Sequence, residues 1–372
     1  MLNLIFKRLS LQFLVLSLIT ISFSSCVRKE PLNSECDIIS ASIDEKYLIE
    51  APIIENNRII FSVKPGSDLS AFAPTFEITD GATIIPSSGT VRDFSTPQTY
   101  IVTSQDKEWK KTYQVIFITH ESKDRYSFEN FEQYSQTMPL FHIFYENEDG
   151  KKNYIWASGN QGFAITNGGN PPETYPTYST TDGYSGRGVT MTTRSTGSLG
   201  SMMGMPIAAG NLFIGSFNVS VASSPSTALK ATQFGKPYSK RPVFIKGWYK
   251  YAPGKIFTDN KNTVIAGKLD EFDIYAVFYE PTPERPHLNG ENILTDKSII
   301  AIARVQDRSA KADFTLFKAQ FVYKPGKTID PEKLKNYKYN MAIICSSSID
   351  GGKFFGAVGS TLIVDEIEII TE

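Results

Sequence analysis

Residues 241–254, RPVFIKGWYKYAPG, contain the stretch that most clearly indicates how this chain folds. Side chains alternate along it: Trp248 shares one face with two lysines, whereas Tyr249 and Tyr251 share the opposite face. A period of two is typical of a β-strand, and the Ala-Pro-Gly that follows predicts a turn. One face must line a core. We expect the lysine face to meet water, which would leave Trp248 exposed.

Similar short runs continue in both directions from this stretch, separated by Gly, Pro and Asn. Only one short helix is indicated among them, at residues 331–336. A contiguous set of strands with so little helix predicts a two-sheet sandwich, and favours a jelly roll. The strand candidates are FHIFYE, YIWAS, GVTMTTR, LFIGSFN, RPVFIKGWYKY, FDIYAVFYE, IIAIARV, FTLFKAQFVY, YNMAIICSSS and STLIVDEIEII.

A separate β-rich segment precedes these strands. Its candidates DIISASI, RIIFSV, TFEI, TYIVTS and YQVIFI lie roughly ten residues apart, a spacing that suits an immunoglobulin-like sandwich. The charged stretch HESKDR separates the two segments. We therefore predict an all-β chain with an N-terminal immunoglobulin-like β-sandwich over 37–120 and a larger jelly-roll β-sandwich over 121–372.

The first 26 residues predict export and lipid attachment. A short basic region and the apolar run LSLQFLVLSLITISF lead to two serines and then Cys26, which is the layout of a secretory signal. A lipoprotein signal peptidase needs such a cysteine, so we expect removal of 1–25, lipidation of Cys26 and a tether over 26–36. Phe23 departs from the usual leucine, which leaves an ordinary signal peptide as the alternative. The expected location is the outer membrane or cell surface, with the lipid as the only membrane contact.

Charge and cysteine content exclude several classes of protein. The 38 basic and 39 acidic residues are interspersed and give a net charge of −1, so no basic stripe points to nucleic acid. Apart from Cys26 only Cys36 and Cys345 remain, too few for a disulfide framework, and we expect both thiols to be free. With 3 histidines in the whole chain, a histidine-based metal site or proton relay has little support.

The larger segment contains a series of motifs: YSFENFE, WASGNQG, AAGNLFIGSF, GKPYSKRPVFIKGWYKYAPG, DEFDIYAVFYE and GAVGSTLIVDEIEI. In these motifs it resembles a known Bacteroidetes family, the "putative carbohydrate metabolism domain", which is a jelly-roll module. This resemblance covers nearly all of 121–372 and implies a protein that handles glycans. Likewise, the run from DLSAFAPTFEI to YQVIFI is similar to immunoglobulin-like modules of Bacteroidetes lipoproteins.

Sugar recognition needs an aromatic ring against the C–H face of a pyranose and planar polar groups for its hydroxyls. Trp156 and Asn160 offer both within WASGNQG, and Trp248 offers an exposed ring. Tyr251 is placed to line a concave sheet, and Asp273 begins a row with two tyrosines in FDIYAVFYE. Ordinary core packing or a solvated face is the alternative for each. We predict that these residues bind a polysaccharide or oligosaccharide without cleaving it.

Catalysis and metal binding are weaker expectations. A glycosidase needs two carboxylates about 5–9.5 Å apart, and neither spacing nor an apolar setting marks out a pair among Glu129, Asp270, Glu271, Asp273 and Asp365. A glycoside hydrolase therefore remains an alternative, as does a structural, adhesin-type sandwich. The resemblance also implies a structural calcium held by acids of the first and last strands, here Glu129 and Asp365. We expect no other cofactor.

Overall fold

The computed structural model describes residues 31–119, 121–134, 141–148, 150–222 and 224–372. Strands dominate this part of the chain, and none of its helices is long and apolar enough to cross a membrane. The expected signal segment and Cys26 lie outside the described residues. The helices are α2 (Asn160–Asn167), α3 (Gly197–Met202), α4 (Pro225–Ala228) and α5 (Pro331–Lys335).

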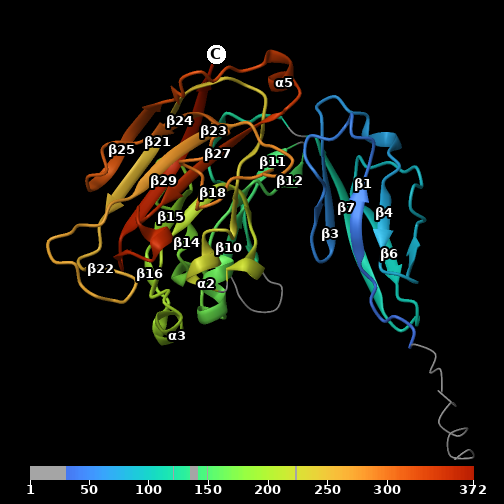
Figure 1. The fold of residues 1–372 in the computed structure, drawn as a ribbon, viewed down its shortest axis with the longest axis horizontal. Coiled ribbons are helices and arrows are strands. Elements are labelled where there is room, and N and C mark those ends of the chain that lie inside the picture. Colours follow the sequence, from blue (N-terminus) through green and yellow to red (C-terminus); the bar gives the residue numbers. More distant parts are fainter. Residues whose placement is uncertain (1–30, 120, 135–140, 149, 223) are drawn as a thin grey trace, which may run out of the picture.

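The N-terminal strands form the expected immunoglobulin-like sandwich (Figure 1). One sheet has the order β2-β3-β7-β6-β5, and β1 pairs with β4 in the other. Tyr113, Val115 and Phe117 of β7 all face the core, as their alternation predicts. The strands are β1 (Ile38–Ser42), β2 (Ile53–Ile54), β3 (Arg58–Val63), β4 (Thr75–Ile78), β5 (Thr83–Ile85), β6 (Gln98–Thr103) and β7 (Lys110–Thr119).

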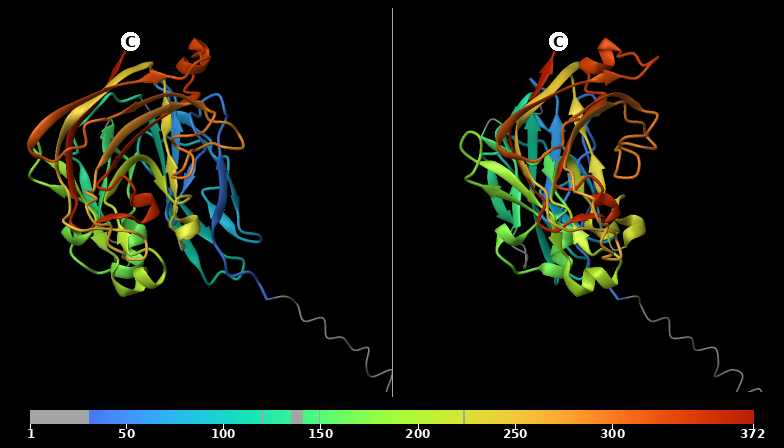
Figure 2. Two further views of the ribbon diagram at one scale, coloured as in Figure 1. Left: turned by 60° about the vertical axis from the view of Figure 1, so that its left-hand side comes forward. Right: turned by 90° about the vertical axis from the view of Figure 1, so that its left-hand side faces the viewer.

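The larger domain, called the head below, is a jelly-roll β-sandwich whose strands curve across the molecule (Figure 2). Its eight-stranded sheet has the order β13-β18-β27-β23-β24-β26, with β19 and β20 attached to β18 and β27. These strands are β13 (Trp156–Ala157), β18 (Asn211–Phe217), β19 (Thr232–Phe234), β20 (Lys236–Tyr238), β23 (Asp273–Tyr279), β24 (Ile299–Arg304), β26 (Val322–Tyr323) and β27 (Tyr339–Ser346).

The second sheet of the head has six strands in the order β14-β15-β29-β21-β25, with β8 paired to β29. They are β8 (Arg125–Tyr126), β14 (Thr177–Thr180), β15 (Gly188–Thr192), β21 (Pro242–Ala252), β25 (Lys311–Gln320) and β29 (Thr361–Thr371). Four two-stranded pairs complete the head: β9 (Phe131–Tyr134) with β10 (Phe141–Phe144), β11 (Glu146–Glu148) with β12 (Lys151–Asn153), β16 (Arg194–Ser195) with β17 (Ile207–Ala208), and β22 (Phe257–Thr258) with β28 (Gly356–Ala357).

Strand β21 alternates as its sequence predicts. Ile245, Tyr249 and Tyr251 point into the main core, between the two sheets of the head. Trp248 and the flanking lysines are only half-buried, because they lie on the outer face of the six-stranded sheet. Because this face is in contact with solvent, polar and apolar residues alternate along the strand.

Strand β23, by contrast, is buried along its whole length, because the eight-stranded sheet is covered on both faces. Its inward side chains Ile274, Ala276 and Phe278 join the main core. The other face of β23 joins a second core, which is closed by Leu288 and Ile293 from the loop that follows the strand. A strand covered on both sides is expected to be almost continuously apolar, as FDIYAVFYE is.

Both described cysteines are unpaired. Cys36 is half-buried beside the N-terminal core. Burial raises the pKa of the Cys345 thiol far above its usual range. Since the thiolate is the reactive form, Cys345 behaves as an inert core residue.

Polar contacts join the N-terminal sandwich to the head. Lys236 of β20 forms an ion pair with both carboxylate oxygens of Glu50, at 3.0 and 2.9 Å. Lys151 donates to the carbonyl oxygen of Phe117 at 3.0 Å. In addition, the Arg58 guanidinium lies 4.5 Å from the ring centroid of Tyr154. The two sandwiches therefore touch through specific side chains as well as through the connecting chain.

Glu148, in strand β11 of the head, gives stability a predictable pH dependence. Burial raises the pKa of Glu148 from 4.5 to about 7. Between these values the folded chain holds a proton that the unfolded chain has lost, so stability falls as pH rises. We expect Glu148→Gln to remove this loss, about 2 kcal/mol for this partly exposed group. In the parent chain Asn153 Nδ2 donates to Glu148 Oε2 at 3.0 Å, and the glutamine oxygen can accept the same hydrogen bond.

The measurement is the free energy of unfolding in urea for both chains at pH 4.5 and pH 7.5. The parent chain should lose more stability than the variant across this interval, because the variant has no carboxyl group to ionise at that position. Parallel pH profiles would show that Glu148 titrates normally in the folded chain.

Candidate functional site

Polar side chains form a row across three neighbouring strands of the eight-stranded sheet. Asn211 of β18 pairs with Ser346 of β27, which in turn pairs with Asp273 of β23. Paired residues point to the same face of a sheet, so the three lie side by side. Tyr275 lies on that face too, and it pairs with Arg304 of β24. A ring and a guanidinium thus border the polar row.

The row occupies the face that turns away from the six-stranded sheet. Tyr275 belongs to the second core, which forms on this outer face. The loop over residues 280–298 covers the face near Tyr279 but leaves Asn211 and Ser346 only half-buried. The polar end of the sheet is therefore partly open at Asn211 and Ser346, whereas Asp273 beside them is buried. We call these three residues the polar row.

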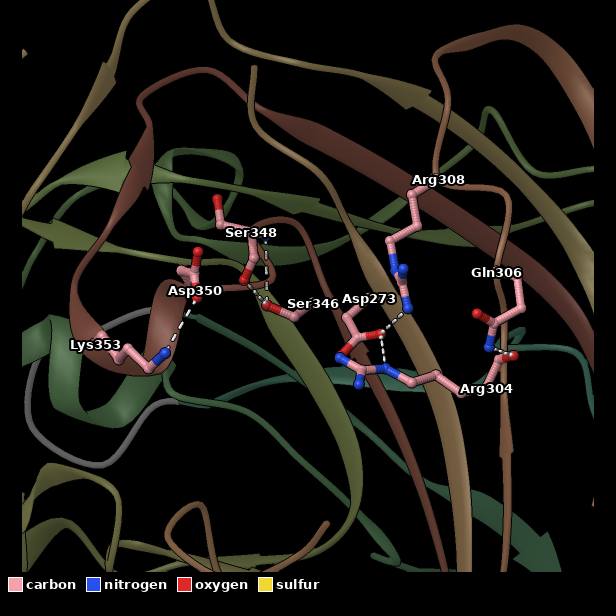
Figure 3. Close-up of polar contacts among 8 residues, drawn as sticks. All are labelled: Asp273, Arg304, Gln306, Arg308, Ser346, Ser348, Asp350 and Lys353. Carbon is pink, nitrogen blue, oxygen red and sulfur yellow. Dashed lines mark hydrogen bonds and ion pairs between the residues drawn. The ribbon is translucent and has the colours of Figure 1, made fainter. Parts of the chain in front are cut away.

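Two arginines converge on Asp273 (Figure 3). Arg304 donates from Nε to Oδ1 at 2.9 Å and from Nη2 to Oδ2 at 2.6 Å, which is a bidentate pair. Arg308 approaches from the loop after β24, with Nη2 at 3.7 Å from Oδ1. The Asp273 side chain is 6% exposed, so the pair is shielded from solvent. Hydrogen bonding to Asp273 raises the pKa of Arg304, which keeps its guanidinium charged.

A second charged group lies on the other side of Ser346 (Figure 3). The Ser346 hydroxyl donates to the carbonyl oxygen of Ser348 at 3.0 Å, at the start of the loop after β27. Farther along this loop, Asp350 accepts from Lys268 at 3.0 Å and from Lys353 at 3.4 Å. The polar row is thus flanked by cationic side chains at both ends.

Asp270 holds the loop between β27 and β29 in place. Its Oδ2 accepts from the hydroxyls of Ser348 at 2.6 Å and Ser360 at 2.7 Å, and from the backbone N–H of Ala357 at 2.8 Å. The residue is 2% exposed, and burial raises its pKa. Asp270 therefore has a structural role and does not face a ligand.

A cleft of about 660 Å³ opens beside Arg304 at the edge of the sandwich. It lies between β24 and β25, and Gln306 and Leu316 help to line it. Tyr249 and Phe317 of the main core also line it, so the cleft opens between the two sheets at their edge.

Trp156 has a core role in place of the ligand role expected from the sequence. Its side chain is 5% exposed, and its Nε1 donates to Glu146 at 2.8 Å. Its ring packs edge-on against Tyr126, at 5.2 Å, and tilted against Phe128, at 5.1 Å. Strand β13 turns this side chain inward, away from the outer face.

Asn160 is also buried, and it begins a helix where the sequence suggested a loop. It is 0% exposed at the start of α2. Its Nδ2 donates to the carbonyl oxygen of Thr177 at 2.6 Å, and its Oδ1 accepts from the backbone N–H of the same residue at 3.0 Å. The amide joins α2 to β14 and is closed off from solvent, so a sugar cannot reach it.

Tyr251 lies in the main core with 2% of its surface exposed. Its ring packs against Phe272 at 4.9 Å, and its hydroxyl donates to the carbonyl oxygen of Ser347 at 3.3 Å. The inner face of β21 packs against the other sheet and does not line a concave surface. Of the five residues predicted to bind sugar, this places Tyr251 with Trp156 and Asn160 in the interior.

Trp248 lies on the outer face of the six-stranded sheet, whereas Asp273 belongs to the eight-stranded sheet. Tyr184 stacks on its ring at 3.9 Å with an angle of 7° between the planes. Tyr184 is 47% exposed, so its ring covers the indole and presents itself to solvent instead. The two remaining predicted residues, Trp248 and Asp273, thus occupy different sheets and do not form one site.

The two acids expected to hold calcium both bind one loop, over residues 182–187. Glu129 accepts from the backbone N–H of Arg187 at 2.9 Å, and Asp365 from that of Ser185 at 2.9 Å. Calcium requires about six to eight oxygen ligands, and the described residues contain no cluster of three or more acidic, histidine or cysteine side chains. The observed donors to both acids are amides, so this geometry adds no support for calcium.

Arg304 and Arg308 were not anticipated as site residues. A signal for the first was available, because an arginine within the apolar strand IIAIARV must find a partner if it is buried. Arg308 carries no such signal, since it follows the strand in a polar loop. Its approach to Asp273 depends on how that loop folds back over β23.

Two family profiles match the chain. The profile described as "Putative carbohydrate metabolism domain" matches residues 127–370, and the profile described as "SGBP, N-terminal" matches residues 38–116. No curated protein matches the chain.

Solved structures from two Bacteroides species are similar to the chain. A Bacteroides thetaiotaomicron protein named a putative glycoside hydrolase is 45% identical, with a TM-score of 0.83, over 93% of this chain and 99% of that one. A Bacteroides vulgatus protein of the same name is 39% identical, with a TM-score of 0.64, over 68% of this chain and all of that one (100%).

Proposed function

The chain belongs to the putative carbohydrate metabolism domain family, and on this basis we propose that it binds carbohydrate without cleaving it, at the polar row of the eight-stranded sheet. The supporting observation is the register that aligns Asn211, Ser346 and Asp273 beside Tyr275. Asn211 already accepts from the backbone N–H of Gly159 at 2.8 Å and donates to the carbonyl oxygen of Ala209 at 3.1 Å. Because Asn211 and Ser346 are only half-buried, their remaining hydrogen-bonding capacity can serve sugar hydroxyls.

The proposed setting is the bacterial surface. Cys26 would carry a lipid that holds the chain at the outer membrane, and the N-terminal sandwich would act as a spacer below the head. The match of residues 38–116 to the profile "SGBP, N-terminal" supports a role at the surface. In this arrangement the protein captures polysaccharide for later use by the cell.

The test is retention of the purified chain on a panel of immobilised plant, host and microbial polysaccharides. Ser346→Leu places a bulky apolar side chain in the middle of the polar row, and we expect at least about tenfold weaker binding, a loss of about 1.4 kcal/mol. Tyr184→Ala is the control, because Tyr184 is exposed on the opposite sheet. It should bind as the parent chain does.

Thermal melting of each variant must show a folded protein before its binding is compared. Retention on no polysaccharide would refute carbohydrate binding. Loss of binding in Tyr184→Ala, with Ser346→Leu unaffected, would move the site to the Trp248 face.

A glycoside hydrolase is the second candidate, favoured by the names of the two Bacteroides relatives. Both oxygens of Asp273 are held by Arg304. Partial burial raises the pKa of Asp350, but hydrogen bonding to Lys268 and the charge of this lysine outweigh burial and bring the pKa below its ordinary value. A general acid needs a raised pKa, so Asp350 does not suit that role. Release of reducing sugar from any glycan of the panel, abolished by Asp273→Ala, would establish this alternative.

A further inference from the structure

Two positive charges meet one negative charge beside the polar row. Arg304 occupies both oxygens of Asp273, at 2.9 and 2.6 Å. Arg308 stands at 3.7 Å from the nearer oxygen, which is too long for a hydrogen bond. One guanidinium is therefore neutralised by Asp273, and the charge of the other is left over.

One donor of Arg308, its Nε, has no acceptor among the residues that the structure describes. Its side chain is 16% exposed, and its Nε is buried without a hydrogen-bond partner. A buried donor left unsatisfied destabilises the folded chain, and more so when it is charged. Native proteins seldom leave such a group without a partner, which can be a protein group, water or a bound ligand. The guanidinium is therefore available to an acceptor on a ligand.

The loop that carries Arg308 is ordered by its own contacts. Asp307 accepts from the backbone N–H of Ser309 at 3.0 Å and from its hydroxyl at 2.6 Å. Lys311 pairs with Asp307 at 3.0 Å, so this carboxylate is engaged elsewhere. Arg308 is held over Asp273 by this turn (Figure 3), and such preorganisation lowers the entropic cost of binding.

A similar excess of cations occurs on the other side of the row, where Lys268 and Lys353 share Asp350. These lysines are more exposed than the arginines, at 41% and 73%. Since the whole chain has a net charge of −1, a general surplus of basic residues does not explain the pattern. The positive groups gather where the ligand is proposed to bind.

We propose that the carbohydrate bound at this site carries an anionic substituent, either a uronic acid carboxylate or a sulfate ester, which Arg308 binds. The inference rests on the proposed function and names its substrate class. A carboxylate or sulfate presents two oxygens to the planar fork of a guanidinium and compensates its charge. A neutral hydroxyl offers a single oxygen and no charge.

Matched glycans test this inference. Affinities of the purified chain are measured for polygalacturonate and its methyl-esterified form, and for a sulfated galactan and neutral galactan. We expect the charged member of one pair to bind at least about tenfold more tightly, and the pair concerned identifies carboxylate or sulfate. The preference should shrink at 1 M salt, where the screening length is only about 3 Å.

Arg308→Gln should lose at least about tenfold in affinity for the charged glycan and keep its affinity for the neutral one. Arg308→Lys, which retains the charge without the fork, should fall between. Arg241→Gln is the matched control, because Arg241 pairs with Glu372 at an exposed position, at 2.8 Å. It should leave all affinities unchanged.

Two results would overturn the inference while the proposed function stands. One is equal binding of charged and neutral glycans, and the other is an Arg308→Gln chain that keeps its affinity for the charged glycan. Failure of the parent chain to bind any glycan would overturn the proposed function as well.

Discussion

A chain carrying Trp156→Ala is expected to unfold with a free energy about 4 kcal/mol below that of the parent chain. The indole is 5% exposed, and its removal leaves a cavity between Tyr126 and Phe128. It also deprives Glu146 of the donor at 2.8 Å. Unfolding in urea measures the loss. Trp156→Phe, which keeps most of the volume, should lose about half as much.

The matched control is Trp109→Ala, because Trp109 is 61% exposed on the N-terminal sandwich. Its effect should stay within about 0.5 kcal/mol. Glycan affinity separates a core role from a ligand role: folded Trp156→Phe should bind as the parent does. A Trp156→Phe chain of normal stability that no longer binds glycan would restore Trp156 as a ligand residue.

Replacing Asp273 by asparagine is expected to reduce both stability and binding. Breaking a buried ion pair by removing one partner costs about 3–5 kcal/mol. The Arg304 side chain is 29% exposed and can recover some hydration, so we expect about 3 kcal/mol. The arginines would lose their fixed positions beside the row, and glycan affinity should fall by at least about tenfold.

Asp182→Asn is the control for this change, since Asp182 forms an ion pair with Lys250 but its side chain is 58% exposed. It should cost less than about 1 kcal/mol. A double-mutant cycle of Asp273→Asn with Arg304→Gln should give a coupling energy of about 1–3 kcal/mol. Additive effects in the cycle would mean that the pair does not hold the site together.

Predictions that depended on short stretches of sequence were confirmed by the fold. Alternation in β21 placed Trp248 outside and Tyr249 inside, and the structure shows Trp248 half-buried on the outer face and Tyr249 in the core. The helix expected near residue 331 is α5. Such patterns succeed because a strand exposes its side chains alternately to two faces, whatever lies beyond them.

The candidate site could be predicted only in part, and the reason lies in what covers each face. Asp273 lies in a row with two tyrosines of FDIYAVFYE. The sequence did not decide whether this row binds a ligand or is simply a solvated face. In the structure Tyr275 and Tyr279 of that face are buried, because the loop over 280–298 covers them. The continuous apolar character of β23 was the available sign that both of its faces are covered.

By itself, then, the sequence determined the all-β class, the position of many strands along the chain, the family and the core-facing side of β21. Tertiary structure alone decided that Trp156, Asn160 and Tyr251 lie inside, that Tyr184 covers Trp248, and that Arg304 and Arg308 meet at Asp273. The physical reason is distance along the chain. Strand periodicity is a local property, whereas register between strands and coverage by loops depend on contacts between residues that are far apart in sequence.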